Sequence, residues 1–469
     1  MIVPRSRLLF WVAMVILPFA TLGAMLPGAL FPSLVLIAGL AGVAAFDALL
    51  AHGVLDGISV NLPEVIRLAK DREGAIEFKL KNERQKHRRL RLGLVFPPEI
   101  ESAHEDVHVN LQSGSEWSRL AWRCRPRKRG NYRLHKTCLE GASPLGFWSM
   151  RTTIPASSEI RVYPNLLTER NDLAALFLHR GAFGLHAHRQ VGKGRDFEKL
   201  REYVHGDSYD EIHWKATAKR GHPVTKVFQI ERTQEVYVII DASRLSARQA
   251  VASSEFRVPN LIEGDATGQP GTRHAQSGIK CETALERFVT AALVLGLAAE
   301  QQGDLFGLLT FTDKVENFVR ARNGRAHYNA CRDTLYTLEP QTVAPDFDEV
   351  AAFIRLRLRR RALLVFLTAL DDPVLAESFV RHVDLVCRQH LVLVNMLKPA
   401  GAAPLFSSPN TDTMDELYQR LGGHIQWQNL RELEKVLQRR GVRFSLLENE
   451  KLSAQLVSQY LAVKQRQLL

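Results

Sequence analysis

The uncharged stretch Leu8–Leu26, LLFWVAMVILPFATLGAML, decides the architecture of the chain, because a helix of this length crosses a hydrocarbon layer of ~30 Å. A Pro-Gly pair follows it, and a second uncharged run extends over Ala29–Phe46. The two runs predict a membrane hairpin within residues 1–52, with spans at about 8–26 and 29–49.

A cleaved signal peptide is the alternative interpretation of this region, with Arg5 and Arg7 as its basic segment. The apolar part of a signal peptide is short, so the second apolar run favours the hairpin. Basic residues precede the first span, are absent from the turn and resume after the second span at Arg67, Lys70 and Arg72. The positive-inside rule therefore predicts a two-span protein of the inner (cytoplasmic) membrane, with both termini and the soluble domains in the cytoplasm.

The overall composition excludes several classes of protein. Lys and Arg total 62 against 50 acidic residues in a chain of 469, which excludes an acidic disordered chain and leaves an anionic partner open. The cysteines are odd in number, widely spaced and never in C-x-x-C pairs, which supports neither a disulfide framework nor a zinc finger. They are Cys124, Cys138, Cys281, Cys331 and Cys387. A reducing compartment is expected.

Residues 56–165 have the pattern of an all-β domain. Apolar and polar residues alternate in runs such as Ala75–Leu80 and Leu90–Leu94, which Gly and Pro separate, and this predicts an immunoglobulin-like sandwich. Basic residues cluster at 86–91 and 123–129. A solvated surface is the favoured interpretation of these clusters, and lipid headgroups are the better of the two functional alternatives, the other being nucleic acid.

The most distinctive stretch is Gly192–Arg232, GKGRDFEKLREYVHGDSYDEIHWKATAKRGHPVTKVFQIER. It mixes basic and acidic residues around Tyr203 and Trp214, a composition that suits a salt-bridged linker better than a docking surface. Its histidines lack the i, i+4 spacing of a helical zinc site. The Gly192-Lys193 pair is not a phosphate-binding loop, because the preceding Gly and the following Ser or Thr are missing.

This stretch resembles the hallmark of the bacterial and archaeal family known as domain of unknown function 58. The residues that carry the resemblance include Gly194, Phe197, Arg201, Tyr203, Gly206, Asp207, Trp214 and Lys215. The resemblance implies that residues 166–233 form a family signature segment, that these eight residues bind a partner, and that residues 234–469 form a von Willebrand factor type A-like domain. One departure is Tyr209-Asp210, at a place where relatives carry Arg.

The C-terminal part alternates between strand and helix patterns. Apolar β-branched runs predict strands at Val236–Ile240, Leu305–Phe311, Ala362–Thr368 and Leu391–Leu397. Helical spacing is found at residues 285–297 and 374–389. This rhythm predicts a doubly wound α/β sheet, whose ligands bind beyond the carboxyl ends of the strands. Residues 247–280, rich in Ser, Gly, Pro and Thr, predict a surface insertion.

Type A domains carry a Mg²⁺ site at this edge, and by resemblance its ligands fall on residues that are mostly altered here. Asp241 and Ser243 remain, but Leu245, Pro345 and Ala369 replace three oxygen ligands. Weak or absent metal binding and no cofactor are expected, because Mg²⁺ needs several hard oxygen ligands. Asp371 and Asp372 lie nearby in sequence as possible substitute ligands.

Three functions follow from these patterns. The first is a non-enzymatic, membrane-anchored adaptor, which by resemblance works with a MoxR-type AAA+ ATPase in the assembly or maturation of a protein complex. The second is a metal-dependent hydrolase at the membrane, for which no catalytic motif is present. The third is a nucleic-acid-binding protein, which lacks a recognisable recognition motif. We expect the adaptor, and no nucleic acid as a partner.

Overall fold

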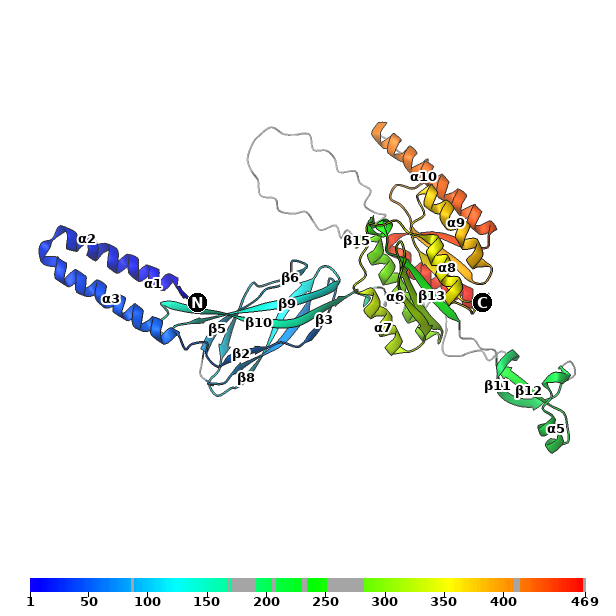
Figure 1. Ribbon diagram of the computed structural model, residues 1–469, viewed down its shortest axis with the longest axis horizontal. Helices are drawn as coiled ribbons and strands as arrows, with labels where there is room; N and C mark the ends of the chain where they lie inside the picture. Colours follow the sequence, from blue (N-terminus) through cyan, green and yellow to red (C-terminus); the bar gives the residue numbers. More distant parts are fainter. Residues whose placement is uncertain are drawn as a thin grey trace. The chain divides into compact units, whose positions relative to one another are not determined.

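The computed structural model describes residues 1–85, 88–167, 169, 191–204, 208–229, 234–250, 282–405, 407 and 414–466 (Figure 1). Two compact units can be distinguished, Met1–Asn165 and Leu166–Leu469. The predicted signature residues Gly206 and Asp207, the histidine between Val204 and Gly206, Cys281 and most of the predicted insertion 247–280 lie outside the described residues.

The first unit begins with the predicted apolar hairpin, drawn in blue in Figure 1. Helix α1 (Ser6–Trp11), a π-helical turn and α2 (Leu17–Met25) run on into one another, and α3 (Leu30–Ala51) returns. The helices Ser6–Met25 and Leu30–Ala51 have mean hydropathies of 2.2 and 2.3 and are almost entirely exposed. So much exposed apolar surface is unfavourable in water, so the hairpin has the character of a membrane anchor.

The β part of the first unit consists of two sheets. The strands are β1 (Ile2–Pro4), β2 (Ile58–Asn61), β3 (Val65–Ala69), β4 (Gly74–Asn82), β5 (Arg88–Leu94), β6 (Ile100–Ser102), β7 (Val107–Leu111), β8 (Trp117–Pro126), β9 (Gly130–Ala142) and β10 (Trp148–Tyr163). One sheet has the order β1-β10-β9-β5-β7, with β3 also paired to β10, and the other has the order β2-β4-β8-β6. The side chains between the sheets form one apolar core.

The predicted alternation in this part is confirmed. Ile76, Phe78 and Leu80 on β4 are buried while the residues between them are exposed, and Leu90 and Leu92 repeat the pattern on β5. Successive strand residues point to opposite faces, so each alternating run places its apolar side chains between the sheets.

Asp47 joins the anchor to the β sheets. Its carboxylate lies near the end of α3, is fully buried, and accepts hydrogen bonds from the Ser143 hydroxyl at 2.6 Å and from the Leu145 and Phe147 N–H groups at 3.0 and 3.1 Å. The Trp148 indole N–H donates to the Ala44 carbonyl of α3 at 2.8 Å. The turn between β9 and β10 is therefore bound to one end of the hairpin.

The start of the first hairpin helix is bound to the same part of the β sheets as the end of the second. Strand β1, which precedes α1, pairs antiparallel with β10, with Ile2 opposite Met150 and Pro4 opposite Trp148. The Arg5 N–H donates to the Phe147 carbonyl at 2.9 Å. The chain therefore enters and leaves the hairpin at the same end, beside the β sheets.

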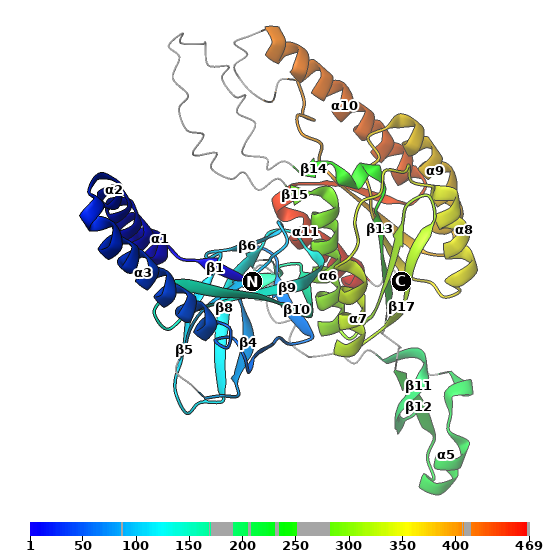
Figure 2. The same cartoon turned by 60° about the vertical axis from the view of Figure 1, so that its left-hand side comes forward.

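The second unit contains a six-stranded sheet with helices on both faces (Figure 2). Its elements are β13 (Glu235–Asp241), α6 (Ala284–Gln301), β16 (Leu305–Phe311), β17 (Val315–Arg322), α7 (Arg325–Leu335), α8 (Phe347–Arg357), β18 (Leu363–Leu367), α9 (Pro373–Cys387), β19 (Leu391–Leu397), α10 (Met414–Arg439), β20 (Arg443–Leu447) and α11 (Leu452–Gln465). The order is β17-β16-β13-β18-β19-β20, and only β17 is antiparallel to its neighbour.

The buried side chains of this sheet belong to two cores, one on each face. Val236 and Val238 of β13 pack with α6, α7 and α11, whereas Tyr237 and Ile239 pack with α8, α9 and α10. A strand covered on both faces is apolar throughout, which explains the continuous run at 236–240. The predicted strands and helices are confirmed to within a few residues of their ends.

A substitution at Asp47 tests the joint between the anchor and the β sheets. Asp47→Ala leaves three donors of the β9–β10 turn without their acceptor, and each unsatisfied buried donor costs about 1–3 kcal/mol. We expect a loss of about 3 kcal/mol in the free energy of unfolding of the detergent-solubilised chain, measured by near-ultraviolet circular dichroism.

Asp56→Ala is the matched control for this substitution. The Asp56 carboxylate pairs with Arg84 at 3.1 Å, but its side chain is 56% exposed, and exposed ion pairs contribute less than about 1 kcal/mol. Equal effects of the two substitutions would contradict the assignment of Asp47 as the joint.

Candidate functional site

Asp241 ends β13 at the point where the strand order reverses. Strand β13 has β16 on one side and β18 on the other, so the loops that leave the carboxyl ends of these strands diverge there. Open α/β sheets bind their ligands in the crevice at such a point. The sequence-predicted residue Asp241 therefore lies where this fold places a site.

The Asp241 carboxylate is fully buried and already has partners for both of its oxygens. Oδ1 accepts a hydrogen bond from the Ser243 N–H at 2.8 Å, and Oδ2 accepts one from the Thr368 hydroxyl at 2.6 Å. Burial raises the pKa of Asp241 above its ordinary value of 3.8, and the hydrogen bonds from Ser243 and Thr368 offset this only in part. Removal from water therefore disfavours the charged form of the Asp241 carboxyl group.

The other acidic side chains at this edge have structural partners too. Asp346 caps α8, with its Oδ1 accepting from the Asp348 N–H at 2.9 Å, and Asp372 caps α9 by accepting from the Val374 N–H at 3.0 Å. Asp371 is paired with the guanidinium of Arg248. A cation of the chain therefore occupies the neighbourhood of the carboxylate that the sequence offered as a substitute ligand.

These residues fit Mg²⁺ poorly. A metal ligand needs an oxygen with free lone pairs and a charge that is stable in the site, whereas Asp241 is desolvated and hydrogen-bonded and Asp371 faces a guanidinium. Ser243 is fully buried, and its hydroxyl accepts a hydrogen bond from the Leu245 N–H at 3.4 Å. Within the described ranges, no group of three or more His, Cys, Asp or Glu side chains is arranged to hold a metal ion.

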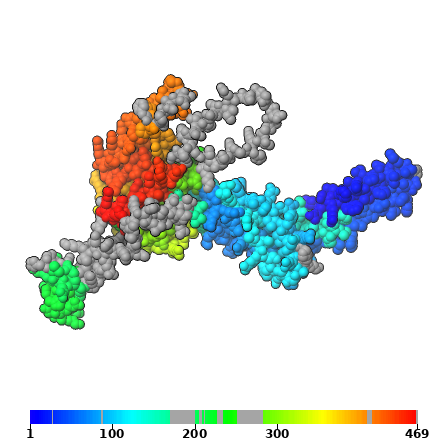
Figure 3. All heavy atoms as spheres, turned by 180° about the vertical axis from the view of Figure 1, so that it is seen from behind, coloured from blue at the N-terminus to red at the C-terminus, as the bar shows by residue number. Residues whose placement is uncertain are grey.

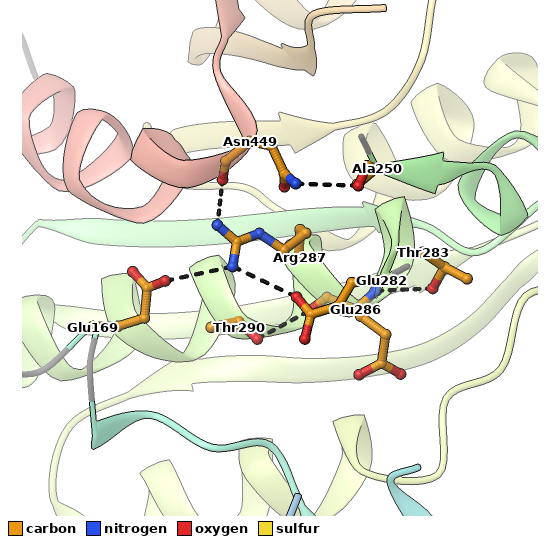
Figure 4. Close-up of polar contacts among 8 residues, drawn as sticks. All are labelled: Glu169, Ala250, Glu282, Thr283, Glu286, Arg287, Thr290 and Asn449. Carbon is orange, nitrogen blue, oxygen red and sulfur yellow. Dashed lines mark hydrogen bonds and ion pairs between the residues drawn. The ribbon is translucent and has the colours of Figure 1, made fainter. Parts of the chain in front are cut away.

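Arg287 on α6 forms polar contacts with several separate segments near this edge (Figure 4). Its guanidinium donates to the carbonyl of Asn449 and lies 3.7 Å from Glu169 and 3.6 Å from Glu282. The Asn449 amide in turn donates to the Ala250 carbonyl at 3.2 Å. Ala250 and Glu282 belong to two short strands, β14 (Gln249–Ala250) and β15 (Glu282–Thr283), which pair on either side of residues 251–281.

The described residues between 191 and 229 of the signature segment form a small β hairpin with a helix, which we call the signature hairpin. Strand β11 (Val191–Glu202) pairs antiparallel with β12 (Val224–Gln229), and α5 (Trp214–Arg220) lies between them in sequence. His213 caps α5 by accepting a hydrogen bond from the Ala216 N–H at 3.0 Å, and the Thr217 hydroxyl accepts from the Val224 N–H at 3.0 Å. The polar residues His213 and Thr217 therefore hold the hairpin together.

Two aromatic side chains of this hairpin face the solvent. Trp214 is 67% exposed and Tyr209 is 72% exposed, and the Tyr209 ring stacks on Tyr203 with centroids 6.1 Å apart. Lys215 is exposed beside Trp214. Large aromatic side chains are enriched in protein interfaces and contribute strongly there, so this face is a candidate docking surface.

The structure thus separates the sequence-predicted residues into two groups. Asp241 and Ser243 lie at the carboxyl edge of the sheet, and Asp371 and Asp372 lie in the loop after β18. Arg201, Tyr203, Trp214 and Lys215 belong to the hairpin. Gly194 and Phe197 lie on β11. Sequence reasoning missed Thr368 as a partner of Asp241, and it missed Arg248 and Arg287 because no local pattern marks a cation whose partners are distant in sequence.

Comparison with known proteins gives a family match. The chain matches the family described as "Protein of unknown function DUF58" over residues 199–258 and 271–404, which include α5, β12 and most of the six-stranded sheet. None of the curated proteins matches the chain.

Solved structures show only a remote likeness. An aerotolerance-related membrane protein from Bacteroides fragilis NCTC 9343, carrying multiple mutations to serine, is 14% identical with a TM-score of 0.27, and the match covers 48% of this chain and 100% of that chain. The conserved hypothetical protein BatB from Bacteroides thetaiotaomicron is also 14% identical with a TM-score of 0.27, covering 50% of this chain and 99% of its own. TM-scores this low establish neither a shared fold nor a shared function.

Substitutions of Asp241 distinguish a buried structural carboxyl group from a metal ligand. Asp241→Asn gives a side chain that cannot ionise and keeps an acceptor for the Ser243 N–H, so we expect an unchanged or higher melting temperature. Asp241→Ala leaves the Ser243 N–H and the Thr368 hydroxyl without their acceptor and should lower the free energy of unfolding by about 2 kcal/mol. Millimolar magnesium should leave all three melting temperatures unchanged, and a rise in the unsubstituted chain that Asp241→Ala abolishes would contradict this interpretation.

The pH dependence of stability gives a second readout of the same residue. Because the pKa of Asp241 is raised on folding, the folded state holds the proton more tightly than the unfolded state. Stability attributable to this group is therefore lost as the pH rises from the ordinary value of 3.8 through the raised pKa. Asp241→Asn should lack this loss, as seen in melting temperatures recorded between pH 4 and pH 8.

Proposed function

We propose that this chain, which matches the DUF58 family model over residues 199–258 and 271–404, is a membrane-anchored interaction protein, not an enzyme, and that its partner is a MoxR-type AAA+ ATPase. In this role it would act as an adaptor in the assembly or maturation of a protein complex. The proposal assigns no cofactor and no nucleic acid to the chain. It treats the two-sheet part as immunoglobulin-like and the α/β unit as von Willebrand factor type A-like, a class of binding modules.

The observation that carries the proposal is the exposed aromatic face of the signature hairpin. Burying Trp214 and Tyr209 against a partner would remove their apolar surface from water, which is the main favourable term in protein association. The polar side chains of His213 and Thr217 are engaged within the hairpin, so a partner would not have to break the fold to dock. The family match begins at residue 199 and includes this face.

The internal contacts at the carboxyl edge of the sheet support a role in protein binding that needs no metal ion. Asp241 is held by Ser243 and Thr368, and Arg248 is paired with Asp371. A hydrolase would need an ionisable side chain that can reach a substrate, and these groups are engaged with one another.

The anchor supports an inner-membrane location with a cytoplasmic body. The N-terminal strand β1 and the β sheets lie at the same end of the hairpin, so an even number of crossings is compatible with the predicted topology. Basic residues flank that end of the hairpin, which by the positive-inside rule favours the cytoplasmic side.

The docking surface is tested by Trp214→Ala in the full-length chain. An interface tryptophan commonly contributes about 2 kcal/mol or more, so recovery of the MoxR-type ATPase of the same cell after crosslinking should fall roughly tenfold or more. The measurement is quantitative mass spectrometry of proteins that copurify from detergent extracts.

Leu356→Ala provides the matched control, since Leu356 is 77% exposed on α8 and lies outside the hairpin. It should leave recovery of the ATPase unchanged. If no MoxR-type ATPase crosslinks to the unsubstituted protein, the proposed partner is wrong. If Leu356→Ala and Trp214→Ala reduce recovery equally, the hairpin is not the docking surface.

The topology is tested through Cys138, which is exposed on β9. Burial raises the pKa of Cys124 and Cys387 to about 11 and that of Cys331 to about 12, so these thiols react slowly at neutral pH. In a Cys281→Ser background, a membrane-impermeant maleimide should label the protein only after spheroplasts are permeabilised. Labelling of intact spheroplasts would place the body outside, and Cys138→Ser should abolish either signal.

A further inference from the structure

Strand β20 forms one edge of the six-stranded sheet and pairs only with β19 among the described strands. A cavity of about 670 Å³ runs beside it, between α10 and α11. Figure 3 shows the orange residues of α10 next to red C-terminal residues on the visible face of this unit. We call the cavity the edge groove, and its floor is the outer edge of β20, from Phe444 to Leu447.

The floor of the edge groove offers backbone hydrogen-bonding groups. The Lys398 N–H donates to the Leu447 carbonyl at 2.9 Å, so Leu447 faces β19, and in a parallel pair alternate residues face the same neighbour. Ser445 therefore also faces β19, whereas the N–H and C=O groups of Phe444 and Leu446 point into the edge groove. These groups can accept an additional strand.

The two outer strands of the sheet differ in regularity. Strand β17 pairs with β16 through two register shifts, and such bulges twist an edge and discourage further pairing. Strand β20 pairs with β19 residue by residue from Arg443 to Leu447 without a shift and contains no proline. The β20 edge therefore keeps the regular geometry that strand addition requires.

The walls of the edge groove have different chemistry. On the α10 side lie Trp427 and Arg431, whose guanidinium is 5.4 Å from the indole ring centroid. On the α11 side lie Gln455 and Gln459. Side chains of an added strand alternate between the two faces of the sheet, so every second one would face the indole and the others would face the polar wall.

The charges in the edge groove favour an acidic occupant. Arg431 has Glu434 at 2.8 Å, and Lys451 has Glu448 at 2.8 Å, so both lining carboxylates already have a cation. Lys398 is exposed at the carboxyl end of the strands and is a third lining cation. The lining therefore has three cations and two carboxylates, which leaves one positive charge without a lining carboxylate.

We propose that the edge groove binds an extended segment of a partner protein by strand addition to β20. The segment would place apolar side chains against Trp427 and acidic side chains, in alternation with them, toward Lys398 and Lys451. Such recognition derives its affinity from main-chain hydrogen bonds and its specificity from the alternating side chains. The edge groove shares no residue with the signature hairpin, and the proposal does not rest on the ATPase as partner.

The test uses the detergent-solubilised full-length chain and three blocked, fluorescently labelled nonapeptides. The first alternates valine and glutamate, the second alternates valine and lysine, and the third is the first with proline at its three central positions. Fluorescence anisotropy should show saturable binding of the valine–glutamate peptide, with at least tenfold weaker binding of the other two. Binding should also slow amide hydrogen exchange in residues 443–447.

Two charge-reversing variants locate the binding. Lys398→Glu should weaken binding of the valine–glutamate peptide tenfold or more, whereas Lys314→Glu, an exposed position in the β16–β17 turn, should leave it unchanged. Both variants should melt at the temperature of the parent chain, since both side chains are exposed. Trp214→Ala should not affect peptide binding, which separates this proposal from the docking role of the hairpin.

Several results would overturn the proposal. The absence of saturable binding of the valine–glutamate peptide at millimolar concentration would contradict it, as would equally tight binding of the acidic and basic peptides. Unchanged amide hydrogen exchange in residues 443–447 after peptide binding would contradict it too. A dimer in solution that Lys398→Glu dissociates would show instead that a second copy of the chain covers the edge groove.

Discussion

Among the described residues, three aspartates are completely or almost completely buried, and the need to give each carboxyl group polar partners organises the molecule. Asp47 binds the β9–β10 turn to the end of the apolar hairpin. Asp241 joins the carboxyl ends of β13 and β18 through Thr368. Asp304, just before β16, accepts from the Gln234 N–H at 3.1 Å, from the Lys464 ammonium at 2.7 Å and from the Tyr460 hydroxyl, and so fixes α11 to the sheet. In each case at least one partner comes from a segment distant in sequence, so the full set of contacts exists only when the tertiary structure is complete.

One consequence concerns where this chain can bind other molecules. At the switch point of the sheet, where many α/β domains take up a ligand, the polar groups are engaged with one another, and Arg248 supplies a cation to Asp371. Arg287 gathers Glu282, Asn449 and Glu169 in the same manner. The two surfaces for which binding is proposed, the aromatic face of the signature hairpin and the outer edge of β20, both lie away from this centre.

The elements that sequence predicts well are those whose signal is local. A mainly apolar run such as Leu305–Phe311 or Leu391–Leu397 has the same limits in the structure as in the sequence, because a strand buried on both faces is mainly apolar. Helix α10 and strand β20 were not predicted. Much of α10 is exposed and polar, and β20 is a short edge strand with Arg443 and Ser445 on it, so neither shows a clear apolar period.

The candidate site shows a different limit. The resemblance to type A domains singled out Asp241 and Ser243, and the strand pattern correctly placed them at the carboxyl edge of the sheet. It offered Asp371 as a free carboxylate because the residue that pairs with it, Arg248, is more than a hundred positions away. The state of a carboxylate depends on which cation the fold brings to it and on how much water remains around it. A ligand set carried over from a resemblance therefore states which oxygens are near an edge. Distant residues such as Arg248 and Thr368 decide whether those oxygens are available to a metal or a partner.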